Sequence, residues 1–136
     1  MKKKIIIIII CILIIIGLII TYINYSNKPT QINLSSSQIN TDNTITNELL
    51  TSINNNNYNK YVTLTDNKLA NENTFNELKL AINKDLGNYK NSQFKEAFKI
   101  KNNTVLIYSA DFSKKPSVNL TISTDLNNKI SGLHYS

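Results

Sequence analysis

The stretch that decides the fold is residues 94–123, which read FKEAFKIKNNTVLIYSADFSKKPSVNLTIS. Apolar residues alternate with polar ones in its first and last parts, and a β-rich run, Thr104 to Phe112, lies between them. Turns are predicted at Asn102-Asn103, at Lys114-Lys115-Pro116 and at Asp125 to Asn128, after which Lys129 to Tyr135 forms a last strand. Because a parallel pair needs a connection of about a dozen residues or more, these short loops predict a four-stranded antiparallel sheet.

Helical patterns precede this stretch. Ile45, Leu49 and Ile53 are spaced by four residues and define one helical face. A longer helix is predicted from the capping pair Thr74 and Glu77 to a stop at Gly87, with an apolar face made of Phe75, Leu78, Ile82 and Leu86. Brief helical turns are expected between the two, over residues 58–62 and 64–70, with Thr65 or Asp66 as a cap.

Helices followed by an antiparallel sheet define an α+β domain. We expect the helix that ends at Gly87 to lie across one face of the sheet. A strongly curved sheet wrapped around that helix would give a cone with a pocket.

The N-terminal part of the chain predicts a membrane anchor. Residues 1–4 are a basic tip, and nineteen uncharged, mostly apolar residues follow, Ile5 to Ile23. A helix of this length spans about 28 Å, close to the roughly 30 Å hydrocarbon core of a bilayer. Three lysines before the segment and the single Lys28 soon after it place the N-terminus in the cytoplasm. We therefore expect a single-pass protein of the cell membrane, with a flexible stalk over residues 24–41 and an extracytoplasmic α+β domain over residues 42–136.

The apolar segment has two alternative interpretations, a cleaved signal peptide and a lipoprotein signal. A cleaved signal peptide has a shorter apolar stretch and small residues at the cut, whereas residues 21–25 are bulky. A lipoprotein signal would use Cys11, which lacks small residues beside it and has few apolar residues before it. An uncleaved helix therefore fits the sequence best.

Composition excludes several classes of function. The charge of +6 falls to +3 without the basic tip, the sequence has no Arg, and its lysines are spread thinly, so nucleic-acid binding is disfavoured. Cys11 is the only cysteine, which excludes a disulfide framework. His134 is the only imidazole and has no second His or extramembrane Cys as a partner, so no metal site is expected. No cofactor is expected either.

Residues 47–133 resemble a family, the domain of unknown function 3887. The matching features are the helix followed by Asn-Asn-Tyr58-Asn-Lys-Tyr61, the helix end at Leu86-Gly87-Asn88-Tyr89, the run Val105 to Phe112, and the end Asp125 to Leu133. The resemblance implies an extracytoplasmic domain with the cystatin-like, nuclear-transport-factor-like cone fold. It implies no catalytic residue, and the α/β-hydrolase that often follows this domain would need a Gly-x-Ser-x-Gly motif, which the sequence lacks.

Five residues are candidates for a ligand pocket, each with a structural alternative. Tyrosines line pockets and fill core edges equally well. Asp111 and His134 would form an acid–base dyad if the sheet brought them together, although a histidine near a chain end is more often simply exposed. The candidates are Tyr61, Tyr89, Tyr108, Asp111 and His134.

Two classes of function follow from these observations. The first is a non-catalytic, membrane-anchored domain that binds an unknown small ligand or a protein, and one form of it is a scaffold subunit of a surface or secretion assembly. The second is a small cone-fold enzyme that works through Asp111 and His134 together with Tyr108. The absence of catalytic motifs favours binding over catalysis.

Overall fold

The computed structural model describes residues 27–136. The expected cytoplasmic tip, the expected transmembrane helix over residues 5–23 and the start of the expected stalk lie outside the described residues. Within the described part, no helix is both long and apolar enough to cross a bilayer. The elements follow in the order β1 (Thr30–Ile32), α2 (Ser36–Asn54), α3 (Tyr58–Leu64), α4 (Glu72–Asp85), β2 (Tyr89–Ile100), β3 (Asn103–Phe112), β4 (Val118–Thr124) and β5 (Ile130–Tyr135).

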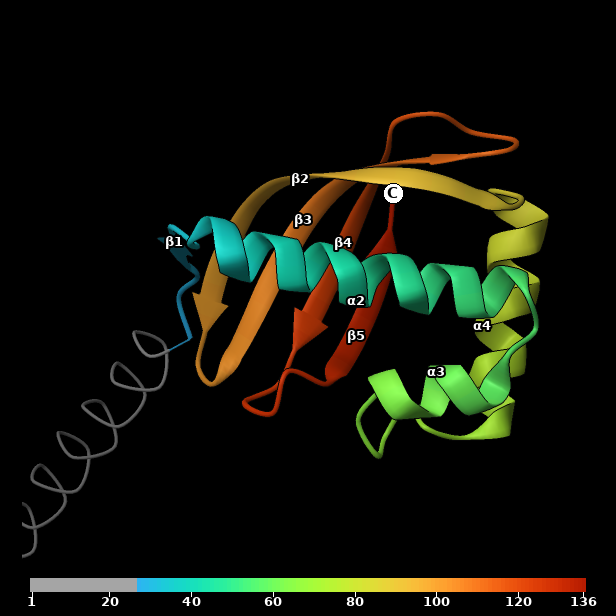
Figure 1. Ribbon diagram of the computed structural model, residues 1–136, viewed down its shortest axis with the longest axis horizontal. Coiled ribbons are helices and arrows are strands. Elements are labelled where there is room, and N and C mark those ends of the chain that lie inside the picture. The colour runs from blue at the N-terminus through green and yellow to red at the C-terminus, as the bar shows by residue number, and fades with distance from the viewer. Residues whose placement is uncertain (1–26) are drawn as a thin grey trace, which may run out of the picture.

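The domain is α+β, as the sequence predicted. Residues 27–136 form one antiparallel sheet in which the five strands lie in chain order, β1-β2-β3-β4-β5 (Figure 1). The four strands expected after Gly87 are β2 to β5, and the turns predicted between them are confirmed. At two of these turns Lys101 and Asn128 take a positive φ, which bends the chain back at once.

The prediction of four strands is wrong because β1 adds a fifth. Thr30 pairs with Lys99 and Ile32 with Ala97, so β1 lies on the edge of the sheet beside β2. Residues 30–41 were expected to belong to the flexible stalk, but they contain β1 and the first turns of α2. A three-residue edge strand, Thr-Gln-Ile, is too short to show an alternating pattern, and its partner supplies the register.

The helix that crosses the sheet is α2. It lies over one face of the sheet (Figure 1), which we call the inner face. Ser35 caps its start through a capping box with Gln38, and its second half buries Leu49, Leu50 and Ile53. Leu106, Tyr108, Leu120 and Ile122 are buried beneath it on the sheet.

The expectation that the helix ending at Gly87, α4, lies across one face of the sheet is wrong. Figure 1 shows α4 beside the far end of α2, next to α3. Phe75 and Ile82 are buried, but Leu78 is only half-buried, so the apolar stripe of α4 is narrower than its sequence implies. Its main aromatic contact is with α3, where the rings of Phe75 and Tyr61 are 4.9 Å apart.

The ends of α4 confirm one of the two predicted signals. Asn71, and not Thr74, is the N-cap, because its side chain accepts a hydrogen bond from Thr74 N at 2.9 Å. At the other end Gly87 has a φ of +80°, as a left-handed stop requires. A Cβ at this position would lie 2.1 Å from Ser113 Oγ, so glycine is needed for close approach as well.

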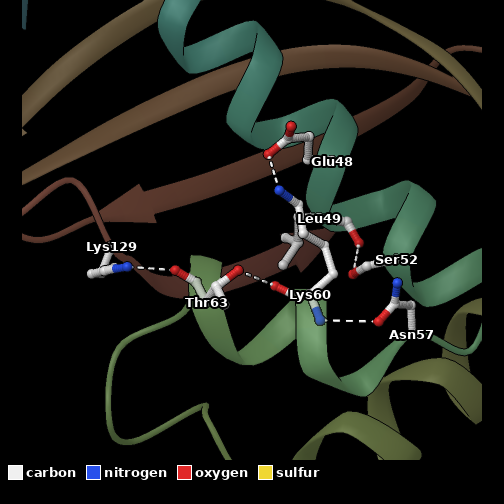
Figure 2. A network of polar contacts seen from close by, with 7 residues as sticks. All are labelled: Glu48, Leu49, Ser52, Asn57, Lys60, Thr63 and Lys129. Carbon is white, nitrogen blue, oxygen red and sulfur yellow. Dashed lines mark hydrogen bonds and ion pairs between the residues drawn. The ribbon is translucent and has the colours of Figure 1, made fainter.

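A set of polar contacts ties α3 to α2 and to the turn before β5 (Figure 2). The ammonium of Lys60 pairs with Glu48 at 2.8 Å, and Asn57 caps α3 by accepting from Lys60 N at 3.0 Å. Lys129 donates to Thr63 O at the other end of α3. Residues 65–70, expected as a helical turn, instead form a loop without helix.

Candidate functional site

A cleft lies between the first half of α2 and the ends of β3 and β4. Its volume is about 240 Å³. The helix contributes hydroxyl, amide and carboxyl groups, and the sheet contributes two threonines. The lining residues are Leu34, Ser37, Gln38, Thr41, Asp42, Thr104, Thr124 and Asn128.

The helix side of the cleft follows from the period of α2. Gln38, Asp42 and Thr46 are four residues apart, which puts them on one helical face. Gln38 and Asp42 line the cleft, and Thr46, one turn further on, is fully buried. This helical face, which we call the polar stripe of α2, therefore continues from the cleft into the core. There Tyr108 of the sheet lies opposite it.

The sheet side of the cleft follows from strand register. Thr104 at the start of β3 pairs with Thr124 at the end of β4, and both side chains belong to the inner face. The hydroxyl of Thr124 donates to Thr104 O at 3.5 Å. Asn128, in the turn between β4 and β5, completes this wall.

Two groups in or next to the cleft have pKa values that burial raises. Burial raises the pKa of the Asp42 carboxyl above its ordinary value. Burial also raises the pKa of Tyr108 to about 12, and the charge of Asp42 adds to this rise. The nearby Thr46 hydroxyl opposes this rise in pKa. The geometry of Thr46 and Tyr108 does not form a hydrogen bond, and neither hydroxyl has a partner among the described residues.

The three candidate tyrosines are placed by the structure on the inner side of the sheet, but at different points. Tyr108 is fully buried next to Thr46, beyond the cleft. Tyr61 is fully buried in α3 against Phe75, and burial raises its pKa to about 12. Tyr89, at the start of β2, contacts Asn47 Oδ1 on α2 through its hydroxyl. They do not share one pocket.

Asp111 and His134 are not brought together. Both project from the outer face of the sheet. Asp111 lies between residues of β3 that face the core, and His134 alternates with residues of β5 that face the core. His134 pairs with Thr121, which pairs with Ile107, four residues along β3 from Asp111. That register separates them by two strands, roughly 10 Å, and by roughly 13 Å along the strand. Asp111 instead accepts a hydrogen bond from Ser117 N at 2.9 Å.

Sequence reasoning missed the residues that line the cleft. A signal for them was present, because Asp42 and Thr46 are polar residues placed at the same four-residue spacing as the apolar face of α2. That signal was hidden because residues before position 42 were assigned to the stalk. The threonines of the sheet give no signal before the register is known.

A second hollow, of about 230 Å³, lies where α2 meets α3. Asn57 and Lys60 line it, and both are already engaged, Asn57 as the cap of α3 and Lys60 in its ion pair with Glu48 (Figure 2). These two polar side chains therefore have structural partners, unlike the buried hydroxyls behind the α2–sheet cleft.

Within residues 27–136, no group of three or more His, Cys, Asp and Glu side chains is placed to hold a metal ion. Comparison of the chain with protein-family models, with curated proteins and with solved structures found no match.

Proposed function

We propose that this chain is a membrane-anchored, extracytoplasmic binding domain without catalytic chemistry, and that it takes a small polar ligand in the α2–sheet cleft. The observation that carries the proposal is the polar stripe of α2. Asp42 opens into the cleft, and the buried hydroxyls of Thr46 and Tyr108 lie behind it without partners. Buried polar groups are normally hydrogen-bonded, so unpaired ones next to a cleft indicate a place for a polar molecule.

The lining limits the chemistry of the ligand. It holds hydroxyls, amides and one carboxyl, and none of its residues is a lysine. Such a surface offers hydrogen bonds to a neutral or cationic molecule and repels an anion when Asp42 is ionised. The cleft, at about 240 Å³, is smaller than most pockets for drug-sized ligands, so the ligand is small.

Geometry favours binding over catalysis. The acid–base pair of the alternative enzyme hypothesis is Asp111 and His134, and the sheet register keeps these two apart. Asp42 is the only acidic residue that lines the cleft, and the lining contains no histidine or lysine.

The anchor, the orientation across the membrane and the cone fold belong to the same proposal. The apolar run Ile5 to Ile23 supports the anchor, and the lysines before it support a C-terminal domain outside the cell. The order of helices followed by an antiparallel sheet supports the resemblance to the domain of unknown function 3887 and its cystatin-like cone.

A ligand titration with a matched pair of variants tests the cleft. Ser36 and Ser37 are neighbours in the first turn of α2, both exposed, but only Ser37 lines the cleft. The full chain in detergent would be heated with glucose, glycinamide or phosphate as probes. A bound probe raises the unfolding midpoint. We expect glucose or glycinamide to raise it in wild type and in Ser36→Leu, and to have no effect in Ser37→Leu.

Two results would contradict this function. Stabilisation by phosphate alone would show that the site has the opposite charge preference. Equal stabilisation of both leucine variants by glucose or glycinamide would place the ligand outside the cleft.

A further inference from the structure

One row of the sheet separates the bulk of the domain from its end. Thr30, Lys99, Thr104, Thr124 and Ile130 follow one another across the five strands in register. Beyond this row lie the residues that lead into β1 and the turns that join β2 to β3 and β4 to β5. All three therefore lie at one end of the sheet, where the chain enters from its N-terminal side (Figure 1), and we call it the entry end.

The entry end combines exposed positive charge with an exposed apolar side chain. Lys28, Lys101 and Lys129 are exposed there. Leu126, at the tip of the β4–β5 turn, is 70% exposed, more than any other large apolar residue described. Asp125 is the only acidic residue among the described residues beyond this row. Its carboxylate accepts hydrogen bonds from two backbone N–H groups, that of Asn127 at 2.8 Å and that of Lys129 at 2.9 Å.

Chain length limits how far this end can lie from the bilayer. This step rests on the proposed anchor, which ends at Ile23. Six residues, 24–29, then lead to Thr30 at the start of β1. Six fully extended residues span at most about 21 Å. The entry end is therefore the part of the domain that the anchor holds nearest to the membrane.

We propose that the entry end docks on the bilayer surface through anionic lipid headgroups. Lysines near a membrane are attracted to acidic lipids, and this attraction fades within about 10 Å at 0.1 M salt, so it acts only on an end held close. Leu126 enters the headgroup region, where burying its side chain removes apolar surface from water. The tether and the lysines together then fix the orientation of the domain on the membrane.

Tryptophan substitution tests this orientation directly, because the sequence contains no tryptophan. Leu126 and Leu80 are matched positions, 70% and 66% exposed, but Leu80 lies on α4 at the opposite end of the domain. The full-length Leu126→Trp and Leu80→Trp proteins would each be placed in vesicles of phosphatidylcholine with phosphatidylglycerol. We expect a blue-shifted emission, quenched by brominated lipids, from the first and a water-like emission from the second.

Further measurements separate the possible failures. Flotation with the vesicles reports the anchor, so a chain that does not float defeats the proposed function and the docking together. A chain that floats, with equal emission from both variants, overturns the docking alone. Emission that depends on the ratio of protein to lipid, without quenching by brominated lipid, indicates contact between copies and also overturns it.

The lysines provide a charge test of the same surface. Lys28→Gln with Lys101→Gln, added to Leu126→Trp, is expected to lose most of the quenching in vesicles that contain phosphatidylglycerol. The same loss is expected when phosphatidylglycerol is left out. Unchanged quenching in both cases would remove anionic headgroups from the proposal.

Discussion

The two halves of α2 border very different surroundings. Its second half carries Leu49, Leu50 and Ile53, each 1% exposed, packed between the sheet and the helices α3 and α4. Its first half carries Ile39 and Asp42, which are only half-buried, and Asp42 lines the cleft. One helix therefore closes the core at one end and forms a wall of the candidate site at the other. Stability and binding can be changed separately along its length.

Polar contacts strengthen this contrast. Asn54, the last residue of α2, forms two hydrogen bonds with the backbone of Tyr89, one from its amide to the carbonyl at 2.9 Å and one from the N–H to its oxygen at 3.0 Å. This pair joins the helix end to the start of β2. The first half of α2 is instead held by the local capping box of Ser35 and Gln38, and side-chain groups further along it are unpaired. We expect the first half to open more readily than the second.

The largest difference is expected from a matched pair of truncations. Ile53→Ala removes a fully buried side chain and should lower the free energy of unfolding by about 2–5 kcal/mol. Ile39→Ala, in the same helix but at the half-buried end, should lower it by roughly 1 kcal/mol, because less apolar surface returns to water. Thermal unfolding of the full chain in detergent measures both.

The same two variants can also contradict the difference between the two halves of α2. Equal losses from Ile53→Ala and Ile39→Ala would show that the two halves of α2 are packed equally well. The candidate site would then lose its distinction from the core.

The fold was predictable where periodicity or turn chemistry acts locally. The turns at residues 102–103 and 125–128 were predicted because short polar segments interrupt alternating strands. The stop at Gly87 was found because a left-handed conformation favours glycine. The edge strand β1 was missed, because three residues carry no period and their structure comes from pairing with β2.

The arrangement of the helices and the site could not be predicted. Both α2 and α4 have an apolar face, and the sequence does not state which one covers the sheet. The pairing of Asp111 and His134 was equally open, because their separation depends on the register of β3, β4 and β5. The assigned boundary at residue 42 also cut through α2, which hid the part of the helix that lines the cleft.

A smaller effect is expected from removing two buried hydroxyls. Tyr61 lies in the packed helical end, and its hydroxyl has no partner among the described residues. Tyr61→Phe should therefore leave the free energy of unfolding unchanged or raise it by up to about 1 kcal/mol. Tyr108→Phe should likewise leave it unchanged or raise it by up to about 1 kcal/mol, because this buried hydroxyl also has no partner among the described residues. A clear loss of stability from Tyr108→Phe, measured by thermal unfolding, would show that its hydroxyl has a partner in the folded protein and would contradict the unpaired hydroxyls behind the cleft.

The smallest effect is expected at Asp42, and it depends on pH. Burial raises the pKa of this carboxyl above 3.8, so the folded protein holds the proton more tightly than the unfolded chain does. Ionisation of Asp42 therefore weakens folding. The penalty is absent below the unfolded pKa, grows as the pH rises towards the folded pKa and is constant above it.

Asp42→Asn removes this penalty while keeping the shape of the side chain. We expect the variant to be more stable than wild type at pH 7, by less than about 1 kcal/mol because water screens a half-buried group, and to lose that gain at pH 3. Thermal unfolding at the two pH values measures the difference. Asp111→Asn, on the outer face, is the control, because its carboxylate accepts a hydrogen bond from Ser117 N and its removal should bring no gain. A gain for Asp42→Asn that persists at pH 3 would show that charge burial is not its cause, and the carboxyl would then have no special place in the cleft.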